Sequence, residues 1–195
     1  MDTILNVGLN LELLGAMQAT GEAAWGAWDC YRRYLQNVAM SCGVDRDVFD
    51  EIMIRFKERH RVDRKLEFTP GQMRNIALAY RETGEVEGVT YHDDPAQQLM
   101  QAIALVARSW DGEPARLYRN QLQLAPEWGT AVIVQRMVFG NMNPCSGSGV
   151  VFTRNPRAVT AGIGLFGDFT QRSQGEDVVA GLVRPSPVSE AQRLE

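Results

Sequence analysis

The chain has 195 residues, of which 45% are hydrophobic, so it is long enough to bury a core and to form one domain or two small lobes. Its formal net charge of -4 argues against a general nucleic-acid-binding protein, which would carry a basic face. The three cysteines have no paired spacing, and no apolar run approaches the roughly 18 residues of a membrane span, so we expect a cytoplasmic protein without a membrane partner.

The first forty residues divide into a mixed start and a helical segment. Residues 1–20 combine apolar residues with asparagines, and as a free N-terminus they would be poorly held. Between residues 22 and 40, aromatic and aliphatic side chains recur at helical intervals, among them Trp25, Trp28 and Tyr34. We expect a helix here whose aromatic stripe packs in the core.

Three further helices are predicted from apolar periodicity and from capping residues. The first covers about residues 45–61 and exposes a charged face. The second begins at the capping box of residues 69–72, with proline at the first helical position, and Gly84 is expected to end it. The third is capped by Asp94 and continues to Trp110.

The composition becomes strand-like after these helices. Residues 117–124 are predicted to form a strand or an extended link. Residues 129–140 and 146–156 are nearly continuous runs of apolar, β-branched and aromatic residues bounded by glycines, which is typical of buried strands. The sequence therefore predicts an α+β chain, with a helical part followed by a part that contains a sheet.

Polar side chains interrupt this apolar region at few points. They are Gln135, Arg154, Asp168, Gln174 and Glu176. A buried amide or charge costs free energy unless another group pairs with it, so these side chains need a reason to be there. We therefore treat them as the candidates for a binding or catalytic site.

Three motifs in this region resemble, in this order, the nucleotide-binding domain of pyruvate phosphate dikinases. They are VQRMVFGN at 134–141, SGSGVVFTRNP at 146–156 and QGEDVVAG at 174–181. Shorter matches occur along nearly the whole chain, at MDTILNVGLN (1–10), YRR (31–33), DPAQQL (94–99), ARSW (107–110) and WGTAV (128–132). The resemblance implies part of an ATP-grasp-like fold, with a helical lobe and a lobe that has a mainly antiparallel sheet.

The resemblance also implies a division of the chain. Residues 1–20 would belong to the nucleotide-binding lobe, 21–92 would form a helical subdomain, 93–190 would form the sheet-containing ATP-grasp subdomain, and 191–195 look like a tail or a cloning scar. A phosphate-binding segment found in the family is missing, so we expect a fragment. A sheet edge exposed in a fragment favours dimerisation, which makes a homodimer one expected partner.

The resemblance assigns the adenine and phosphate contacts. The strand end formed by Gln135, Arg136, Met137 and Val138 would offer backbone hydrogen bonds to the base, with the methionine as a polarizable wall. An ordinary core strand is the competing interpretation. Arg154 is assigned to the triphosphate as the catalytic cation, because its planar guanidinium offers several donors to phosphate oxygens. A simple surface salt bridge is the alternative for this arginine.

The resemblance also assigns Asp168 and Glu176 to Mg²⁺, and Gln174 to the nucleotide beside them. Magnesium prefers octahedral oxygen ligands and often takes one or two carboxylates together with phosphate oxygens and water. Asp168 stands where the family has a glutamate, so its shorter side chain would reach the ion through a water molecule. Residues 157–160 also depart from the family's usual turn, which leaves the geometry of that loop open.

Function follows from the resemblance in two competing forms. As part of a pyruvate phosphate dikinase, the chain would bind Mg-ATP and phosphate and phosphorylate a histidine on a separate swivelling domain. Pyruvate, the source of phosphoenolpyruvate, would bind in a barrel that this chain lacks, so the chain alone would not complete the reaction. His60 and His92 do not match the phosphorylated histidine and are interpreted as surface residues. The alternative is a degenerate, non-catalytic fragment that serves as an interaction or nucleotide-sensing module.

Overall fold

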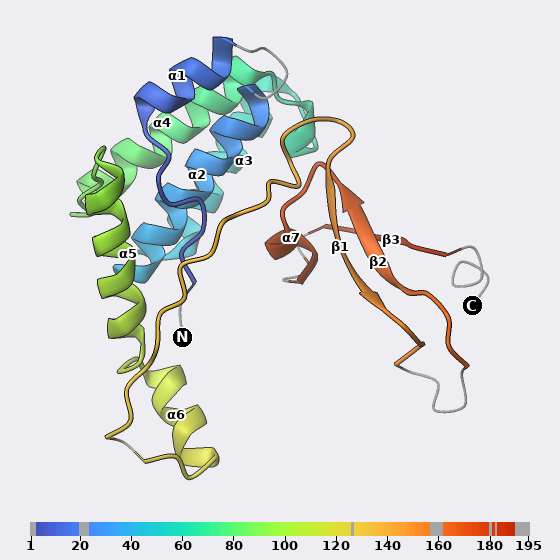
Figure 1. Ribbon diagram of the computed structural model, residues 1–195. Helices are drawn as coiled ribbons and strands as arrows, with labels where there is room; N and C mark the ends of the chain where they lie inside the picture. The colour runs from blue at the N-terminus through green and yellow to red at the C-terminus, as the bar shows by residue number, and fades with distance from the viewer. Residues whose placement is uncertain are drawn as a thin grey trace. The chain divides into compact units, whose positions relative to one another are not determined.

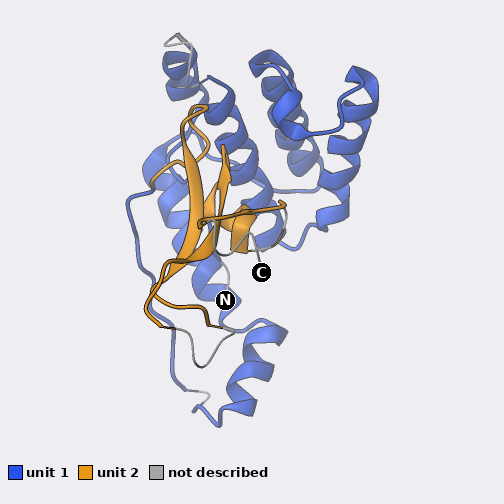
Figure 2. Cartoon of the chain, turned by 90° about the vertical axis from the view of Figure 1, so that its right-hand side faces the viewer, with its two compact units in different colours: residues 1–137 blue, residues 138–195 orange. Residues whose placement is uncertain are grey.

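The computed structural model describes residues 3–19, 24–125, 127–156, 162–179, 181 and 183–189. These residues form an α+β structure with seven α-helices, one short 3-10 helix and a three-stranded sheet (Figure 1). The chain divides into two compact units, residues 1–137 and 138–195 (Figure 2). The expected boundary near residue 92 lies inside the first unit, and the division into ATP-grasp subdomains stays a prediction.

The first unit is helical, and α2 lies at its centre. Its helices are α1 (Leu11–Ala19), α2 (Ala24–Ser41), α3 (Arg46–His60), α4 (Pro70–Val86), α5 (Pro95–Ser109) and α6 (Glu113–Gln121), with the 3-10 helix η1 at Lys65–Glu67. Helices α1, α3, α4 and α5 all contact α2 (Figure 1). The predicted core stripe is confirmed, because Trp25, Trp28 and Tyr34 are all buried. No helix in the described part of the chain is long and apolar enough to cross a membrane.

The predicted caps are present at the starts of the helices. The Thr69 hydroxyl accepts a hydrogen bond from the Gln72 amide at 3.2 Å, and the Gln72 side chain accepts one from the Thr69 amide at 2.8 Å. The Asp94 carboxylate accepts a hydrogen bond from the Gln97 amide at 2.8 Å. These caps satisfy amides that have no partner inside the helix, so local sequence alone sets where α4 and α5 begin.

The start of the chain is better held than a frayed terminus. Leu9 and Leu14 are buried. The Gly8 amide donates to the Gln98 side-chain oxygen at 2.7 Å, and the Gln98 side-chain nitrogen donates to the Leu9 carbonyl at 2.8 Å. Gln98 is itself buried in α5, so it ties the start of the chain to a helix almost ninety residues away. The interpretation of residues 1–20 as a frayed start is therefore wrong for residues 8–14.

A buried carboxylate lies in the second turn of α2. Asp29 is 0% exposed, and its two oxygens accept hydrogen bonds from Arg32, Arg33 and Lys65 at 3.0 to 3.2 Å. Burial alone would raise the pKa of Asp29, but the positive charges of Lys65, Arg33 and Arg32 hold this pKa well below its usual value. From the sequence alone, Arg32 and Arg33 could also contact a neighbouring lobe; in the structure both bind this aspartate within their own helix.

Gly84 does not end its helix. α4 continues to Val86, and Gly88, with a φ of 85°, follows its end. A Cβ on Gly84 would overlap the ring of Tyr91, whose hydroxyl donates to the Leu35 carbonyl at 3.1 Å. The glycine is thus needed for the close approach of Tyr91 to α2, and helix termination requires the left-handed residue further on.

The predicted strand or link at residues 117–124 is mostly helical. α6 begins after Gly112, with Glu113 and Pro114 in its first turn, and ends at Gln121. The Arg119 guanidinium lies 4.0 Å from the centre of the Trp110 ring and donates a hydrogen bond to the Trp110 carbonyl. Glu113 and Pro114 are typical of a helix start, and this signal outweighs the strand-like composition that follows.

The predicted buried strand at 129–140 is also wrong in this structure. Residues 129–139 form no regular secondary structure, and most of their side chains are exposed, including Ile133 at 86% and Val138 at 91%. A strand needs a neighbour that satisfies its backbone amides and carbonyls. None of the described strands pairs with this segment, so its β-forming composition does not become a strand.

The second unit contains a small antiparallel sheet. Its elements are β1 (Gly147–Phe152), β2 (Phe166–Gln171), α7 (Gly175–Val179) and β3 (Ser186–Pro187). β2 is the middle strand and pairs with β1 and β3, both antiparallel (Figure 1). The antiparallel sheet is as predicted, but β1 is largely exposed rather than buried. α7 packs against β1 and β2, so the QGED motif lies against the sheet.

Candidate functional site

The four residues assigned to adenine lie on the extended segment between the helical unit and the sheet. Gln135 and Arg136 are exposed, Met137 is half-buried, and Val138 is 91% exposed. The boundary between the two compact units falls between Met137 and Val138. The assignment of these four residues to the adenine stays a prediction.

Arg154 follows β1 by two residues and is exposed. Among the described residues it makes no ion pair, so the alternative of a surface salt bridge gains no support from that part of the chain. The turn at residues 157–160 that departs from the family pattern lies outside the described residues. An exposed guanidinium at the end of a strand is accessible to a polyanion.

Asp168 occupies the centre of the three-stranded sheet. It is half-buried in β2, opposite Val150 of β1 and opposite Pro187 of β3. Side chains alternate along a strand, so Asp168 lies on the same face of β2 as Phe166 and Thr170. Strands on both sides thus fix the backbone that carries this carboxylate.

The QGED motif divides into buried and half-buried members. Gln174 is 2% exposed and Asp177 is 5% exposed, whereas Glu176 is half-buried. The Asp177 carboxylate accepts a hydrogen bond from the Gln174 amide at 3.2 Å, and the Asp177 amide donates to the Gln174 carbonyl at 3.0 Å. Asp177 therefore caps α7, and Glu176 is the acidic residue of this motif with a partly accessible side chain.

Two carboxylates therefore come from neighbouring elements of one unit. Asp168 lies on β2 and Glu176 on α7, and these two elements contact each other. Oxygen ligands of this kind suit Mg²⁺, which often binds through one or two carboxylates plus phosphate oxygens and water. No cluster of three or more potential metal ligands occurs among the described residues. Two carboxylates are donors of the kind that Mg²⁺ takes together with phosphate oxygens, and their assignment to the metal stays a prediction.

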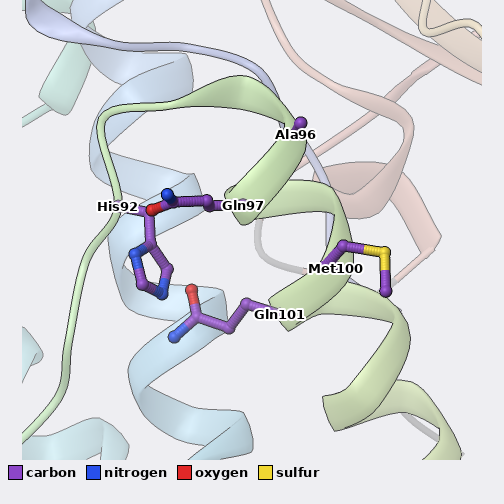
Figure 3. A pocket seen from close by; sticks show the side chains of 5 residues that line it. All are labelled: His92, Ala96, Gln97, Met100 and Gln101. Carbon is purple, nitrogen blue, oxygen red and sulfur yellow. The ribbon is translucent and has the colours of Figure 1, made fainter.

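The first unit contains an open pocket of about 490 Å³ at the start of α5. It is lined by His92, Ala96, Gln97, Met100 and Gln101. In Figure 3 the side chains of His92, Gln97 and Gln101 lie on one side of the helix, and Met100 points away from them. The lining contains no carboxylate, arginine or lysine, so it lacks the charges that a triphosphate and its magnesium need.

His60 is more enclosed than a surface residue. It is half-buried, its ring packs against Phe56 and Phe68, and its Nδ1 lies 3.0 Å from the Gln72 side-chain nitrogen. The interpretation of His60 as a plain surface residue is therefore wrong. These contacts belong to the packing of α3 against Phe68 and α4.

Sequence reasoning missed the residues that hold the QGED motif in place. Ser148 and Ser173 join β1 to the turn before α7 through a 2.8 Å hydrogen bond from the Ser148 hydroxyl to the Ser173 carbonyl. A serine in a glycine-rich run gives no signal for such a distant partner. The cap made by Asp177 was recognisable, since an acidic residue in the first turn of a helix is a common cap.

Comparisons with known proteins agree with the motifs. A family model described as "Pyruvate phosphate dikinase, AMP/ATP-binding domain" matches residues 1–193. The chain is 41% identical over 198 residues to pyruvate, phosphate dikinase of Rhizobium meliloti (strain 1021), which covers 100% of this chain and 22% of that protein. It is 39% identical over 200 residues to the pyruvate, phosphate dikinase of Clostridium symbiosum, and this match covers 98% of this chain and 22% of that protein. It is 41% identical over 189 residues to the chloroplastic pyruvate, phosphate dikinase of Mesembryanthemum crystallinum, and this match covers 95% of this chain and 19% of that protein. The chain thus spans about a fifth of the length of these relatives.

Proposed function

The chain belongs to the AMP/ATP-binding domain family of pyruvate phosphate dikinases, and from this premise we propose that it is the Mg-ATP-binding portion of such an enzyme, with an ATP-grasp-like fold. The observation that carries the proposal is the match over residues 1–193, which includes every residue assigned to the nucleotide and the metal. The parent reaction would convert ATP, pyruvate and phosphate to AMP, phosphoenolpyruvate and diphosphate. The protein would act in the cytoplasm.

Different residues of the second unit would bind the phosphates and the metal ion. Arg154 would bind phosphate oxygens through its guanidinium and stabilise the charge that develops during transfer. Asp168 and Glu176 would hold Mg²⁺, with Gln174 close to the nucleotide. The ion, when bound, neutralises charge on the phosphates. The adenine would lie against Gln135, Arg136, Met137 and Val138. Catalysis would come mainly from positioning and electrostatic stabilisation.

The phosphoryl group would pass to a histidine on a swivelling domain of the parent enzyme, and pyruvate would bind in a separate barrel. Both partners are implied by the family resemblance, and the chain covers 22% of the Rhizobium meliloti protein, which leaves room for them in such an enzyme. The chain by itself would bind nucleotide without turning over pyruvate. A degenerate fragment that only senses nucleotide is the second candidate, favoured by the aspartate at position 168.

Calorimetric titration with ATP, with and without Mg²⁺, tests the proposal. We expect Mg²⁺ to strengthen ATP binding, and Glu176→Ala to remove about 1.4 kcal/mol or more of the magnesium-dependent part, which is roughly tenfold in affinity. Arg154→Ala should weaken ATP binding both with and without Mg²⁺, since an arginine contacts the phosphates directly. If the chain binds no ATP under either condition, the proposal fails for this chain.

A further inference from the structure

The turn between β2 and α7 is enclosed even though it carries no apolar core residue. It consists of Arg172, Ser173 and Gln174, and the last two are 3% and 2% exposed. Arg172 has a φ of 49°, in the left-handed region that residues other than glycine rarely adopt. Such a backbone persists only where the surrounding contacts determine it. This turn connects the strand that bears Asp168 to the helix that bears Glu176.

Two hydrogen bonds join this turn to residues at and just before the start of β1. The Arg172 amide donates to the Ser146 carbonyl at 2.8 Å, and the Ser148 hydroxyl donates to the Ser173 carbonyl at 2.8 Å. Within the turn region, the Ser173 hydroxyl also donates to the Thr170 carbonyl at 3.2 Å. The path of the chain from β2 into α7 is therefore set from β1, a strand more than twenty residues earlier.

Gly140 shows how closely this turn is packed. A Cβ on this glycine would overlap both the Ser148 hydroxyl and the Ser173 carbonyl, and it would lie 2.9 Å from the Gly147 carbonyl. Two of these three atoms are backbone oxygens, which cannot rotate away as a side chain could. A side chain at position 140 would therefore push apart the two atoms that form the bond between Ser148 and Ser173.

The other end of the turn is fixed by Asp177. Its buried carboxylate accepts the hydrogen bond of the Gln174 amide, and its own amide donates to the Gln174 carbonyl. α7 has only five residues, so it contributes little helical stability by itself. Its direction therefore depends on this cap and on the bond between Ser148 and Ser173.

We propose that Ser148 and Asp177 are positioning residues, which hold Glu176 on α7 at a fixed place relative to Asp168 on β2. The inference rests on the proposed function of these two carboxylates in binding Mg²⁺. A divalent ion with strict octahedral geometry binds tightly only when its ligands are held in place. Partners that orient metal ligands commonly change metal affinity about 10-fold to 100-fold when they are removed.

The test combines amide hydrogen exchange at residues 174–179 with calorimetry of ATP, with and without Mg²⁺, on the whole chain. Ser148→Ala and Asp177→Ala should each speed exchange in α7 and weaken the magnesium-dependent part of ATP affinity about 10-fold, while ATP affinity without Mg²⁺ stays unchanged. Asp177→Asn keeps an oxygen that can accept from the Gln174 amide, and it should restore both readouts towards the wild-type values.

Ser109→Ala is the matched control. The Ser109 hydroxyl also donates to a carbonyl at 2.8 Å, that of Val106, but it does so within α5 of the other unit. This variant should change neither readout. Gly140→Ala should reproduce the effect of Ser148→Ala, since it displaces the same bond without removing the hydroxyl.

The outcomes separate this inference from the proposed function. If Glu176→Gln weakens magnesium-dependent ATP binding but Ser148→Ala and Asp177→Ala do not, the positioning role is refuted and the proposed function stands. If Glu176→Gln has no effect, or the chain binds no ATP, the metal role of Glu176 fails and the inference fails with it. Faster exchange in α7 without a change in ATP affinity would mean that these contacts serve only the fold.

Discussion

At the scale of single residues, the buried charge of Asp29 is the feature with the largest expected effect on stability. Three cations surround one carboxylate that has no exposure to solvent. Removing one member of such a group leaves the others buried and uncompensated, which typically costs about 3–5 kcal/mol. An exposed ion pair, in contrast, contributes at most about 1 kcal/mol.

Asp29→Asn is therefore expected to lower the free energy of unfolding by about 3 kcal/mol or more, because Arg32, Arg33 and Lys65 lose their common counter-charge. Urea unfolding followed by circular dichroism measures this change. Asp50→Asn is the control, because Asp50 and its partner Arg46 are both about half exposed and 3.5 Å apart. Equal losses in the two variants would contradict the role given to Asp29.

The same carboxylate predicts a pH dependence. The pKa of Asp29 is lowered in the folded protein, so its contribution to stability is complete above the unfolded value of about 3.9. This contribution should be lost as the pH falls from about 4 through the lower folded pKa, where Asp29 takes up a proton. Urea unfolding between pH 3 and 7 should show less acid dependence for Asp29→Asn than for the wild type. Identical pH profiles would contradict the lowered pKa.

At the scale of elements, replacing Gly84 by alanine would have two opposed effects on stability, one from helix propensity and one from steric overlap. Alanine is preferred over glycine inside a helix by up to about 1 kcal/mol. Its Cβ would overlap the Tyr91 ring, and an added group in a packed site costs about 1–3 kcal/mol. The hydrogen bond of Tyr91 to the Leu35 carbonyl would also be strained. The steric cost therefore outweighs the gain in helix propensity.

Gly84→Ala should therefore lower the melting temperature, although it improves helix propensity. Gly71→Ala in the same helix is the control, since nothing lies within 4 Å of a Cβ at that position, and this variant should leave the melting temperature unchanged or raise it slightly. Differential scanning calorimetry of both variants decides the point. A rise in melting temperature for Gly84→Ala would show that Tyr91 moves away at no cost.

The elements also show what the sequence can predict. The caps at Thr69 and Asp94 depend on neighbours within three residues, so the starts of α4 and α5 were predictable. α6 was missed because Leu117 to Leu124 resemble a strand when Glu113 and Pro114 are ignored. A strand at 129–139 depends on a partner elsewhere, and composition cannot show whether that partner is present. The contacts of Ser148 and Gly140 are equally non-local.

At the scale of the whole molecule, the family and the α+β class followed from motifs, whereas the geometry around the candidate ligands did not. The order of the motifs near Gln135, Arg154 and Glu176 was enough to identify the family, which the match over residues 1–193 confirms. The burial of Gln174 and Asp177 and the exposure of Val138 depend on long-range packing, which a single sequence does not encode in any local pattern.

The exposed segment 129–139 predicts self-association of the chain. None of the described strands pairs with this segment, and Ile133 is 86% exposed. Extended apolar residues outside a sheet favour pairing with a strand of another chain. Ile133→Lys should shift the chain towards the monomer in sedimentation velocity at increasing protein concentration. Val86→Lys makes the same charge change at an 80% exposed position at the end of a helix, and it should have no such effect. A wild-type chain that stays monomeric at all concentrations would contradict this prediction.

On our proposal, Asp168 and Glu176 together hold one magnesium ion for bound ATP. A double-mutant cycle with Asp168→Asn and Glu176→Gln tests it most directly, with the magnesium-dependent part of the ATP binding free energy as the quantity measured by calorimetry. Each single variant should lose about 1.4 kcal/mol, and the double variant should lose clearly less than the sum, because the second carboxylate has then already lost its ion. Strictly additive losses, or ATP affinity that does not depend on Mg²⁺ in the wild type, would contradict a shared metal site.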